Sequence, residues 1–308
     1  MIDDDFRHVN EPLPIASRVM LDRREVGAIG FGCWRLTDPD VGRVAALVEH
    51  AVDLGMNLID NADVYGLDWG GRGWGSCEET LGEIFRRRPG LRDRVVLATK
   101  GGIVPGVPYV SNRPYLKSAC EASLRRLGVD WVDLYQIHRP DPFTHSAEVA
   151  EALVSLRDRG LIRAVGVSNH TVEQTRALQH HLPFPLASTQ PEFSATHLNP
   201  LRDGLLDQAQ ASSCRPLAWS PLAGGRLATG EGVPAELVAV LDEIAGRENV
   251  TRAAVAVAFV LSHPSRPVAI VGTQNPERLG ELARAVDVRL DRRDVYRIVQ
   301  ASDGVPLP

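Results

Sequence analysis

One pattern constrains this chain more than any other: from Ile29 onward, short apolar runs rich in β-branched residues alternate with longer amphipathic stretches of helical period. Eight runs are expected to be strands, at residues 29–34, 57–60, 95–100, 132–138, 162–168, 186–190, 216–220 and 268–273. Several are apolar almost throughout, which is typical of parallel strands covered on both faces. The alternation therefore predicts an α/β chain that closes into a (β/α)8 TIM barrel.

The stretches between the strands carry helix start and stop signals, such as Pro114 at the head of one stretch and Gly128 at its end. Helices are expected at residues 40–54, 78–87, 115–127, 147–159, 172–181, 201–211, 252–261 and 276–285. Outside these units we expect a hairpin at 18–26 that closes the bottom of the barrel, a helix at 234–246 and a terminal helix at 291–300. No linker interrupts the pattern, so residues 1–308 are predicted to form one domain, with 1–16 as a flexible tail.

A chain of 308 residues suits one barrel domain, and its composition excludes several classes of partner. The net charge of −5 and the pI near 6.0 offer no basic field for nucleic acid. The acidic N-terminus is unlike a secretory signal, and no apolar stretch approaches the ~18 residues that span a bilayer. The four cysteines lack metal-ligand spacing. We expect a cytoplasmic protein, a monomer or small homo-oligomer, with reduced thiols, no metal and no membrane or nucleic-acid partner.

Ionisable residues gather at the carboxyl ends of three consecutive predicted strands, where a barrel of this type places its chemistry. Asp60, Lys100 and His138 end those strands, and Tyr65 follows in the loop after the first of them. A tyrosine hydroxyl donates a proton reluctantly at neutral pH, and a neighbouring ammonium would stabilise its phenolate. A carboxylate would keep that ammonium charged. Taken singly, each residue is better explained by a turn, a solvated group, packing or a satisfied histidine. Their joint placement makes an acid catalyst the working hypothesis, and the motif around Asp60 adds the weight that favours it.

The motif around Asp60 resembles that of the aldo-keto reductase family, whose pattern D-x-A-x-x-Y-G stands here as DNADVYG at residues 60–66. The family's catalytic residues fall on Asp60, Tyr65, Lys100 in LATKGG and His138 in YQIHRPDP. Likeness continues through LGVDWVDLYQIH, GVSN, TQPEFS, AWSPLAGG and IVGTQNPERL, over about residues 30–286, and is strongest to bacterial reductases of poorly defined substrate. The resemblance implies that Tyr65 donates a proton while His138 orients the substrate carbonyl.

The same resemblance implies a nicotinamide dinucleotide and assigns residues to it. The nicotinamide would be held by Ser168, Asn169 and Gln190 and stacked on Trp219. The pyrophosphate would be covered by Ser220, Leu222, Gly224 and Arg226, although the glycine pair at 224–225 also suits an ordinary turn. The remaining residues assigned to the cofactor are Gly32, Trp34, Asp60, Gly272, Gln274, Asn275, Arg278 and Glu281.

Two departures from the family pattern bear on the choice of cofactor. Gly272 stands where many members have a phosphate-binding lysine, and Leu282 replaces a common asparagine. Arg278 remains, and a guanidinium suits the 2′-phosphate of NADP(H), so NADPH is expected in preference to NADH. The G-x-G at 30–32 has no third glycine and no acidic ribose partner at the usual spacing, which argues against a Rossmann fold.

A further departure is the stretch LDWGGRGWG at 67–75, which lengthens the loop between Tyr65 and the next helix. Loops at this face commonly set specificity, so we expect either a substrate lid or a mobile surface loop. Its paired indoles would suit an aromatic or sugar-like substrate. The pocket walls are expected to be Trp34, Trp69, Trp74 and Arg139.

These observations predict an NADP(H)-dependent oxidoreductase that reduces aldehydes or ketones to alcohols by direct hydride transfer, with a small carbonyl compound as its partner. One alternative is a sugar or pyridoxal dehydrogenase of the same family that uses NAD or NADP. Another, from a different class, is a non-catalytic nicotinamide-nucleotide sensor or regulatory subunit. A metal-dependent hydrolase would want a His-x-His pair at the first strand, where Phe31, Gly32 and Cys33 stand instead.

Overall fold

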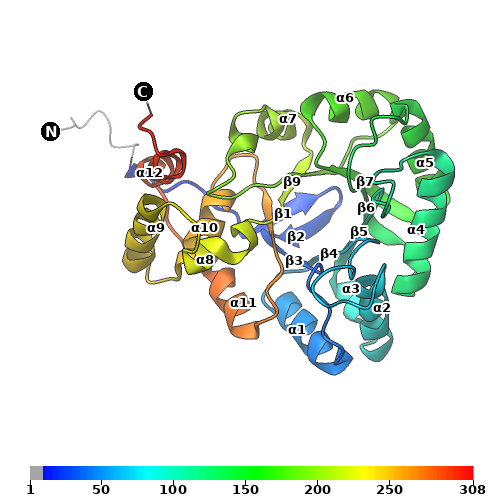
Figure 1. Ribbon diagram of the computed structural model, residues 1–308, viewed down its shortest axis with the longest axis horizontal. Coiled ribbons are helices and arrows are strands. Elements are labelled where there is room, and N and C mark those ends of the chain that lie inside the picture. The colour runs from blue at the N-terminus through cyan, green and yellow to red at the C-terminus, as the bar shows by residue number, and fades with distance from the viewer. Residues whose placement is uncertain (1–9, 308) are drawn as a thin grey trace.

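A closed barrel of eight parallel strands forms the centre of the protein in a computed structural model that describes residues 10–307 (Figure 1). Around the barrel the strands follow in the order β10, β3, β4, β5, β6, β7, β8 and β9, so neighbours in sequence are neighbours in space. Their bounds are β3 Ile29–Gly32, β4 Leu58–Asp60, β5 Val96–Gly101, β6 Val132–Ile137, β7 Ile162–Ser168, β8 Ser188–Gln190, β9 Arg215–Ala218 and β10 Val268–Val271. The predicted barrel and the positions of its strands are confirmed.

Helices surround the barrel, and several begin and end at the expected signals. Asp40 caps the first of them by accepting hydrogen bonds from the backbone of Gly42 and Arg43. Gly128 ends the fourth with φ of 64°, a left-handed conformation that glycine adopts without strain. The helices that pack on the barrel are α1 Val41–Asp53, α2 Ser76–Arg87, α4 Arg113–Leu127, α5 Ser146–Asp158, α6 Val172–His181, α7 Leu205–Ser212, α10 Arg252–Leu261 and α11 Pro276–Ala283.

A two-stranded antiparallel hairpin, β1 Arg18–Leu21 and β2 Arg24–Gly27, covers the amino end of the barrel, as the sequence predicted. Its inward-facing side chains, Val19, Leu21 and Val26, form one apolar cluster with residues of the barrel strands such as Leu58. In Figure 1 the hairpin lies across the middle of the ring of strands. With this end closed, the carboxyl ends of the strands form the open face of the barrel.

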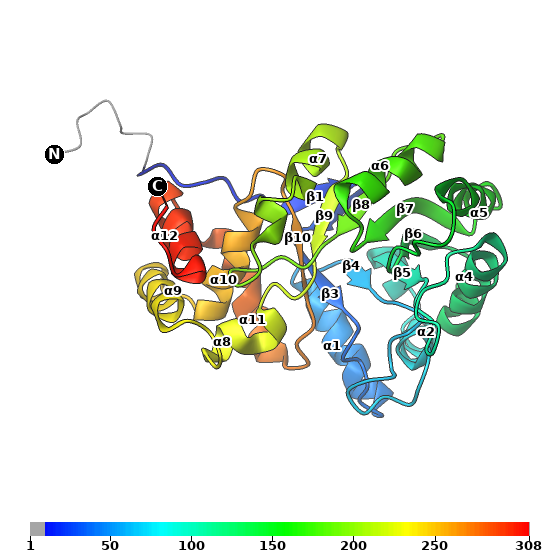
Figure 2. The same ribbon diagram turned by 45° about the horizontal axis from the view of Figure 1, so that its top comes forward.

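Two further helices, α9 Ala235–Glu248 and α12 Arg292–Asp303, pack together at one side of the barrel (Figure 2). Arg247 joins them through two hydrogen bonds to the buried carboxylate of Asp294, at 2.9 and 2.7 Å. The expected flexible tail lies partly outside the described residues, and within the described part the Leu13 amide donates to the Leu290 carbonyl at 2.7 Å.

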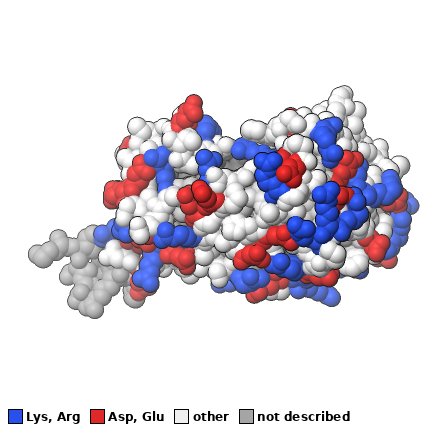
Figure 3. Space-filling model, turned by 90° about the horizontal axis from the view of Figure 1, so that it is seen from below, with Lys and Arg blue, Asp and Glu red and all other residues white. Residues whose placement is uncertain are grey.

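The sequence did not predict the shortest helical elements, which are α3 Leu91–Arg94, α8 Arg226–Thr229 and the 3-10 turns η2 Asn199–Leu201, η3 Ala223–Gly225 and η4 Arg284–Asp287. The helix expected at 201–211 starts later, because the chain forms η2 and then reverses at Gly204, whose φ is 83°. On the face that Figure 3 shows, acidic and basic side chains are interspersed. No helix within residues 10–307 is long and apolar enough to cross a membrane.

Candidate active site

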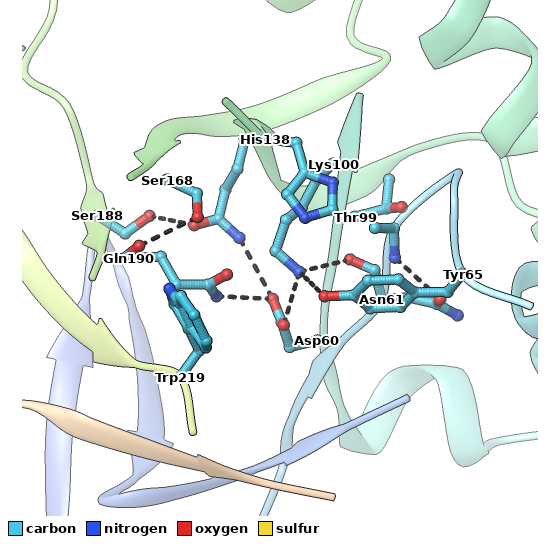
Figure 4. A network of polar contacts seen from close by, with 12 residues as sticks. Asp60, Asn61, Tyr65, Thr99, Lys100, His138, Ser168, Ser188, Gln190 and Trp219 are labelled. Atoms are coloured by element: carbon cyan, nitrogen blue, oxygen red, sulfur yellow. Dashed lines mark hydrogen bonds and ion pairs between the residues drawn. The ribbon is translucent and has the colours of Figure 1, made fainter. Parts of the chain in front are cut away.

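The three strand ends and the following loop bring the four predicted catalytic residues together at the open face of the barrel (Figure 4). The Lys100 ammonium lies at the centre. Its Nζ donates to Asp60 Oδ2 at 2.7 Å, to the Tyr65 hydroxyl at 3.0 Å and to the Asn61 carbonyl at 3.0 Å. All three donor protons of the ammonium therefore have partners, and its position relative to the Tyr65 hydroxyl is fixed.

Burial and charge act in opposite directions on Lys100, which has no exposed surface. Burial alone would lower the pKa of the ammonium, but the adjacent carboxylate of Asp60 and the hydroxyl of Tyr65 raise it above its ordinary value. Lys100 is therefore charged at neutral pH and interacts directly with the phenol oxygen. The expected role of Asp60 in keeping Lys100 charged agrees with this geometry.

Burial dominates at Tyr65 and raises the pKa of its hydroxyl above the ordinary value. Lys100 opposes the rise, whereas the negative charge of Asp60 adds to it. An adjacent ammonium alone would lower this pKa, but here burial outweighs the effect of Lys100. Tyr65 consequently holds its proton at neutral pH, and Lys100 is placed to stabilise the phenolate once the proton leaves.

His138 follows β6 and is almost fully buried, with its ring packed edge to face against Tyr65 at a centroid distance of 5.8 Å. Burial, together with the charges of Lys100 and Arg139, lowers the pKa of the imidazole well below its usual value. The ring is therefore neutral at physiological pH. Its buried Nδ1 atom has no hydrogen-bond partner among the described residues, and the residue lines the catalytic cavity.

Two glutamines complete the surroundings of the Asp60 carboxylate. Oδ1 of Asp60 accepts from the side-chain amides of Gln190 at 3.0 Å and Gln136 at 3.3 Å, and Ser188 donates to the carbonyl oxygen of Gln136 at 3.2 Å. Gln190 was expected near the cofactor, whereas the sequence did not predict a role for Gln136. A glutamine inside the fully buried strand VDLYQI was the available signal.

A cavity of about 1370 Å³ opens above this cluster. It exceeds the ~300–1000 Å³ of an ordinary small-molecule pocket, so it has room for a dinucleotide and a substrate. Asp60, Tyr65 and His138 line it, whereas Lys100 lies beneath its floor. Every residue expected at the cofactor lines this cavity: Gly32, Trp34, Asp60, Ser168, Asn169, Gln190, Trp219, Ser220, Leu222, Gly224, Arg226, Gly272, Gln274, Asn275, Arg278 and Glu281.

The part of the cavity next to His138 fits a planar amide-bearing ring. Trp219 is held in place by a hydrogen bond of 2.9 Å from its indole nitrogen to Asn169 Oδ1. The side-chain amide of Asn169 donates to Ser168 Oγ at 2.8 Å and to the His138 carbonyl at 3.2 Å. Asn169 has φ of 58°, a left-handed conformation that asparagine tolerates better than most residues. These contacts fix the Trp219 ring relative to the catalytic cluster.

Arginines that line the cavity could hold a polyanion. Four of them have no carboxylate partner within residues 10–307, namely Arg35, Arg139, Arg226 and Arg278, although acidic side chains such as Glu231 and Glu281 line the cavity too. Gly224 and Gly225 have φ of 73° and 107°, and a Cβ at either position would meet no atom within 4 Å. The backbone of this loop is therefore accessible to a phosphate group.

Three of the four residues expected at the substrate line the same cavity. Trp34 and Trp69 line it and meet edge to face at 5.8 Å, and Arg139 lines it near Trp219. Trp74, the fourth residue expected there, is half-buried and does not line the cavity. It follows Gly73, whose amide donates to the Gly66 carbonyl at 3.0 Å.

The chain is similar to known proteins over almost its whole length. The model of the Aldo/keto reductase family matches residues 28–303. The chain is 44% identical over 303 residues to a 6-dehydroglucose reductase of Novosphingobium aromaticivorans, covering 96% of this chain and 99% of that protein. It is 34% identical to a 6-dehydroglucose reductase of Agrobacterium fabrum, covering 92% of this chain and 96% of that one.

Solved structures share the fold. The thermostable aldo-keto reductase Tm1743, in complex with the inhibitor epalrestat, superimposes with a TM-score of 0.80 at 26% identity, covering 92% of this chain and 99% of that chain. An aldo/keto reductase from Klebsiella pneumoniae, in complex with NADP and acetate, gives a TM-score of 0.76 at 28% identity, covering 96% and 97%.

Proposed function

The chain belongs to the aldo/keto reductase family, and from that premise we propose that it uses NADPH to reduce an aldehyde or ketone to an alcohol, with Tyr65 as the proton donor. The observation that supports this most is the Lys100 ammonium, which contacts both the Asp60 carboxylate and the Tyr65 hydroxyl beneath a large cavity. A nucleotide-binding protein without catalysis would have no need of a tyrosine hydroxyl held on a buried ammonium.

The residues of the cluster perform the steps of proton transfer. The neutral His138 imidazole donates a hydrogen bond to the carbonyl oxygen and orients it toward Tyr65. Tyr65 donates its proton to the oxygen as negative charge develops there. The phenolate that remains is stabilised by the Lys100 ammonium at 3.0 Å, and Asp60 keeps that ammonium charged. When bound, the nicotinamide of NADPH supplies the hydride.

The preference for NADPH rests on the charge of the cavity. Arg278 has no carboxylate partner among the described residues and lies in the first turn of α11, capped by Asn275, whose side chain accepts from the amides of residues 277 and 278. A guanidinium at a helix N-terminus suits a phosphate ester. The NADP complex of the Klebsiella pneumoniae relative agrees with this choice.

Two of the relatives are named 6-dehydroglucose reductases, and we propose that this chain also acts on a sugar aldehyde of that type. The test is NADPH oxidation followed by its absorbance with 6-dehydroglucose, repeated with NADH, after each cofactor has been titrated by tryptophan fluorescence. We expect tight NADPH binding and rapid turnover. Binding without turnover on any carbonyl compound would favour a nucleotide sensor, and no binding would reject the cofactor site.

A further inference from the structure

The lengthened loop at 67–75 holds one tryptophan in an unusual backbone conformation. Trp69 has φ of 58°, in the left-handed region, where bulky side chains are rare. The Trp69 side chain is 53% exposed and lines the catalytic cavity. Strained residues that remain exposed commonly mark a functional site. Neither burial nor backbone preference explains a tryptophan at this position.

Thr37 and Arg35, in the loop after β3, hold Trp69 in place. The Thr37 hydroxyl donates to the Trp69 carbonyl at 2.9 Å. The guanidinium of Arg35 lies over the indole ring, 4.1 Å from its centroid, and also donates to the Gly224 carbonyl at 3.2 Å. The Trp34 ring meets Trp69 nearly perpendicularly, at 88°. One face of the Trp69 ring is thus covered by a cation, and the ring is fixed relative to Trp34.

From this arrangement, and resting on the proposed function, we infer that Trp69 and Trp34 form a stacking platform that selects a cyclic sugar aldehyde over a simple one. The C–H groups on one face of a pyranose ring form a flat apolar surface, which packs on an indole as other apolar groups do. Two indoles held at right angles would fix the orientation of the pyranose ring while its aldehyde group reaches Tyr65. A short aldehyde is too small to contact both indoles.

Polar groups that line the same cavity favour a polyhydroxylated ligand over a purely aromatic one. Arg139 is half-buried beside the catalytic His138 and has no carboxylate partner within residues 10–307. The exposed Asp68 also lines the cavity, next to Trp69. An aromatic hydrocarbon would leave the donors of Arg139 without partners, whereas hydroxyl groups bond both a guanidinium and a carboxylate.

The experiment compares Trp69→Gly with Trp74→Ala, which removes an indole of the same loop that does not line the cavity. Glycine adopts the left-handed conformation of residue 69 without strain, so the thermal unfolding midpoint of Trp69→Gly is expected to stay close to that of the wild type. The readout is the ratio of kcat/KM for 6-dehydroglucose to kcat/KM for butanal. We expect Trp69→Gly to lower this ratio about tenfold or more, mainly through KM, and Trp74→Ala to leave it unchanged.

The inference is overturned if Trp69→Gly lowers kcat/KM for both aldehydes equally or for neither, or if Trp74→Ala changes the ratio as much. A wild-type enzyme that reduces butanal but not 6-dehydroglucose would also overturn it while leaving the proposed carbonyl reduction intact. If the wild type reduces neither aldehyde with NADPH, the proposed function itself fails. Trp69→Asn, which also tolerates a positive φ, provides a second variant should glycine loosen the loop.

Discussion

The buried carboxyl group of Asp63 leads to a prediction on stability. Asp63 lies between Asp60 and Tyr65 in the sequence, is 1% exposed, and its Oδ1 atom has no hydrogen-bond partner among the described residues. Oδ2 accepts a long hydrogen bond of 3.4 Å from the Tyr115 hydroxyl. Burial, and then the nearby charge of Glu78, raise the pKa of this carboxyl group to about 8. Asp63 is therefore mostly protonated in the folded protein at neutral pH.

The sign of the effect follows from proton binding. Between about pH 4 and pH 8 the folded state keeps the Asp63 proton while the unfolded state releases it, so the folded state loses stability as pH rises. The slope is roughly 1.4 kcal/mol per pH unit, which amounts to about 2.7 kcal/mol between pH 5 and pH 7. An asparagine at this position would be neutral at every pH and would keep an acceptor for Tyr115. Asp63→Asn should thus gain stability relative to the wild type as pH rises.

The measurement is urea unfolding, followed by circular dichroism, of the wild type and Asp63→Asn at pH 5, 6 and 7. The difference in free energy of unfolding between the two proteins should increase by roughly 1 kcal/mol or slightly more with each pH unit. Asp68→Asn, at an exposed position, serves as the control and should give a constant difference. A constant difference for Asp63→Asn as well would refute the argument that Asp63 is protonated in the folded state.

Three further substitutions test separate contacts. Asp60→Asn removes the anion that offsets the burial of Lys100, so turnover should fall at least about a hundredfold. Because Lys100 would then lose its proton more easily, the fall in activity as pH rises should begin at a lower pH than in the wild type, as a pH–rate profile would show. Arg278→Met should weaken NADPH binding about tenfold or more and leave NADH binding nearly unchanged, as measured by fluorescence titration. Arg247→Met leaves the buried Asp294 without its main partner, so the free energy of unfolding, measured in urea, should fall by about 1–3 kcal/mol. This is less than for a fully buried ion pair, because Arg247 is half exposed.

Much of the fold could be predicted because each element has a local signal. The strand runs and the helix-ending glycine at 128 are read from neighbouring residues alone, and all eight strands stand where they were expected. The short helix α3 Leu91–Arg94 was missed because four residues carry no measurable period. The late start of α7 Leu205–Ser212 depends on the reversal at Gly204, which periodicity does not reveal.

At the site, residue types predicted that Asp60, Lys100 and Tyr65 lie together. A carboxylate and an ammonium at adjacent strand ends attract each other, and a tyrosine that acts as an acid needs a nearby ammonium. Gln136 was missed, since its role depends on its side chain reaching Asp60 past the intervening strand β5. The direction of the Tyr65 pKa could not be predicted either, because it depends on how completely the hydroxyl is buried. Trp69 and Trp74 are equivalent in sequence, and only the path of the loop places one in the cavity and the other outside it.

The central claim is that Tyr65 donates the proton while the cofactor site is formed independently of its hydroxyl. The most direct test is a single-turnover experiment in which NADPH-loaded wild type and Tyr65→Phe are mixed with 6-dehydroglucose, with NADPH affinity measured on both proteins. We predict equal NADPH affinity and a loss of about a hundredfold or more in the rate of NADPH oxidation by Tyr65→Phe. Oxidation by Tyr65→Phe at the wild-type rate would contradict the account.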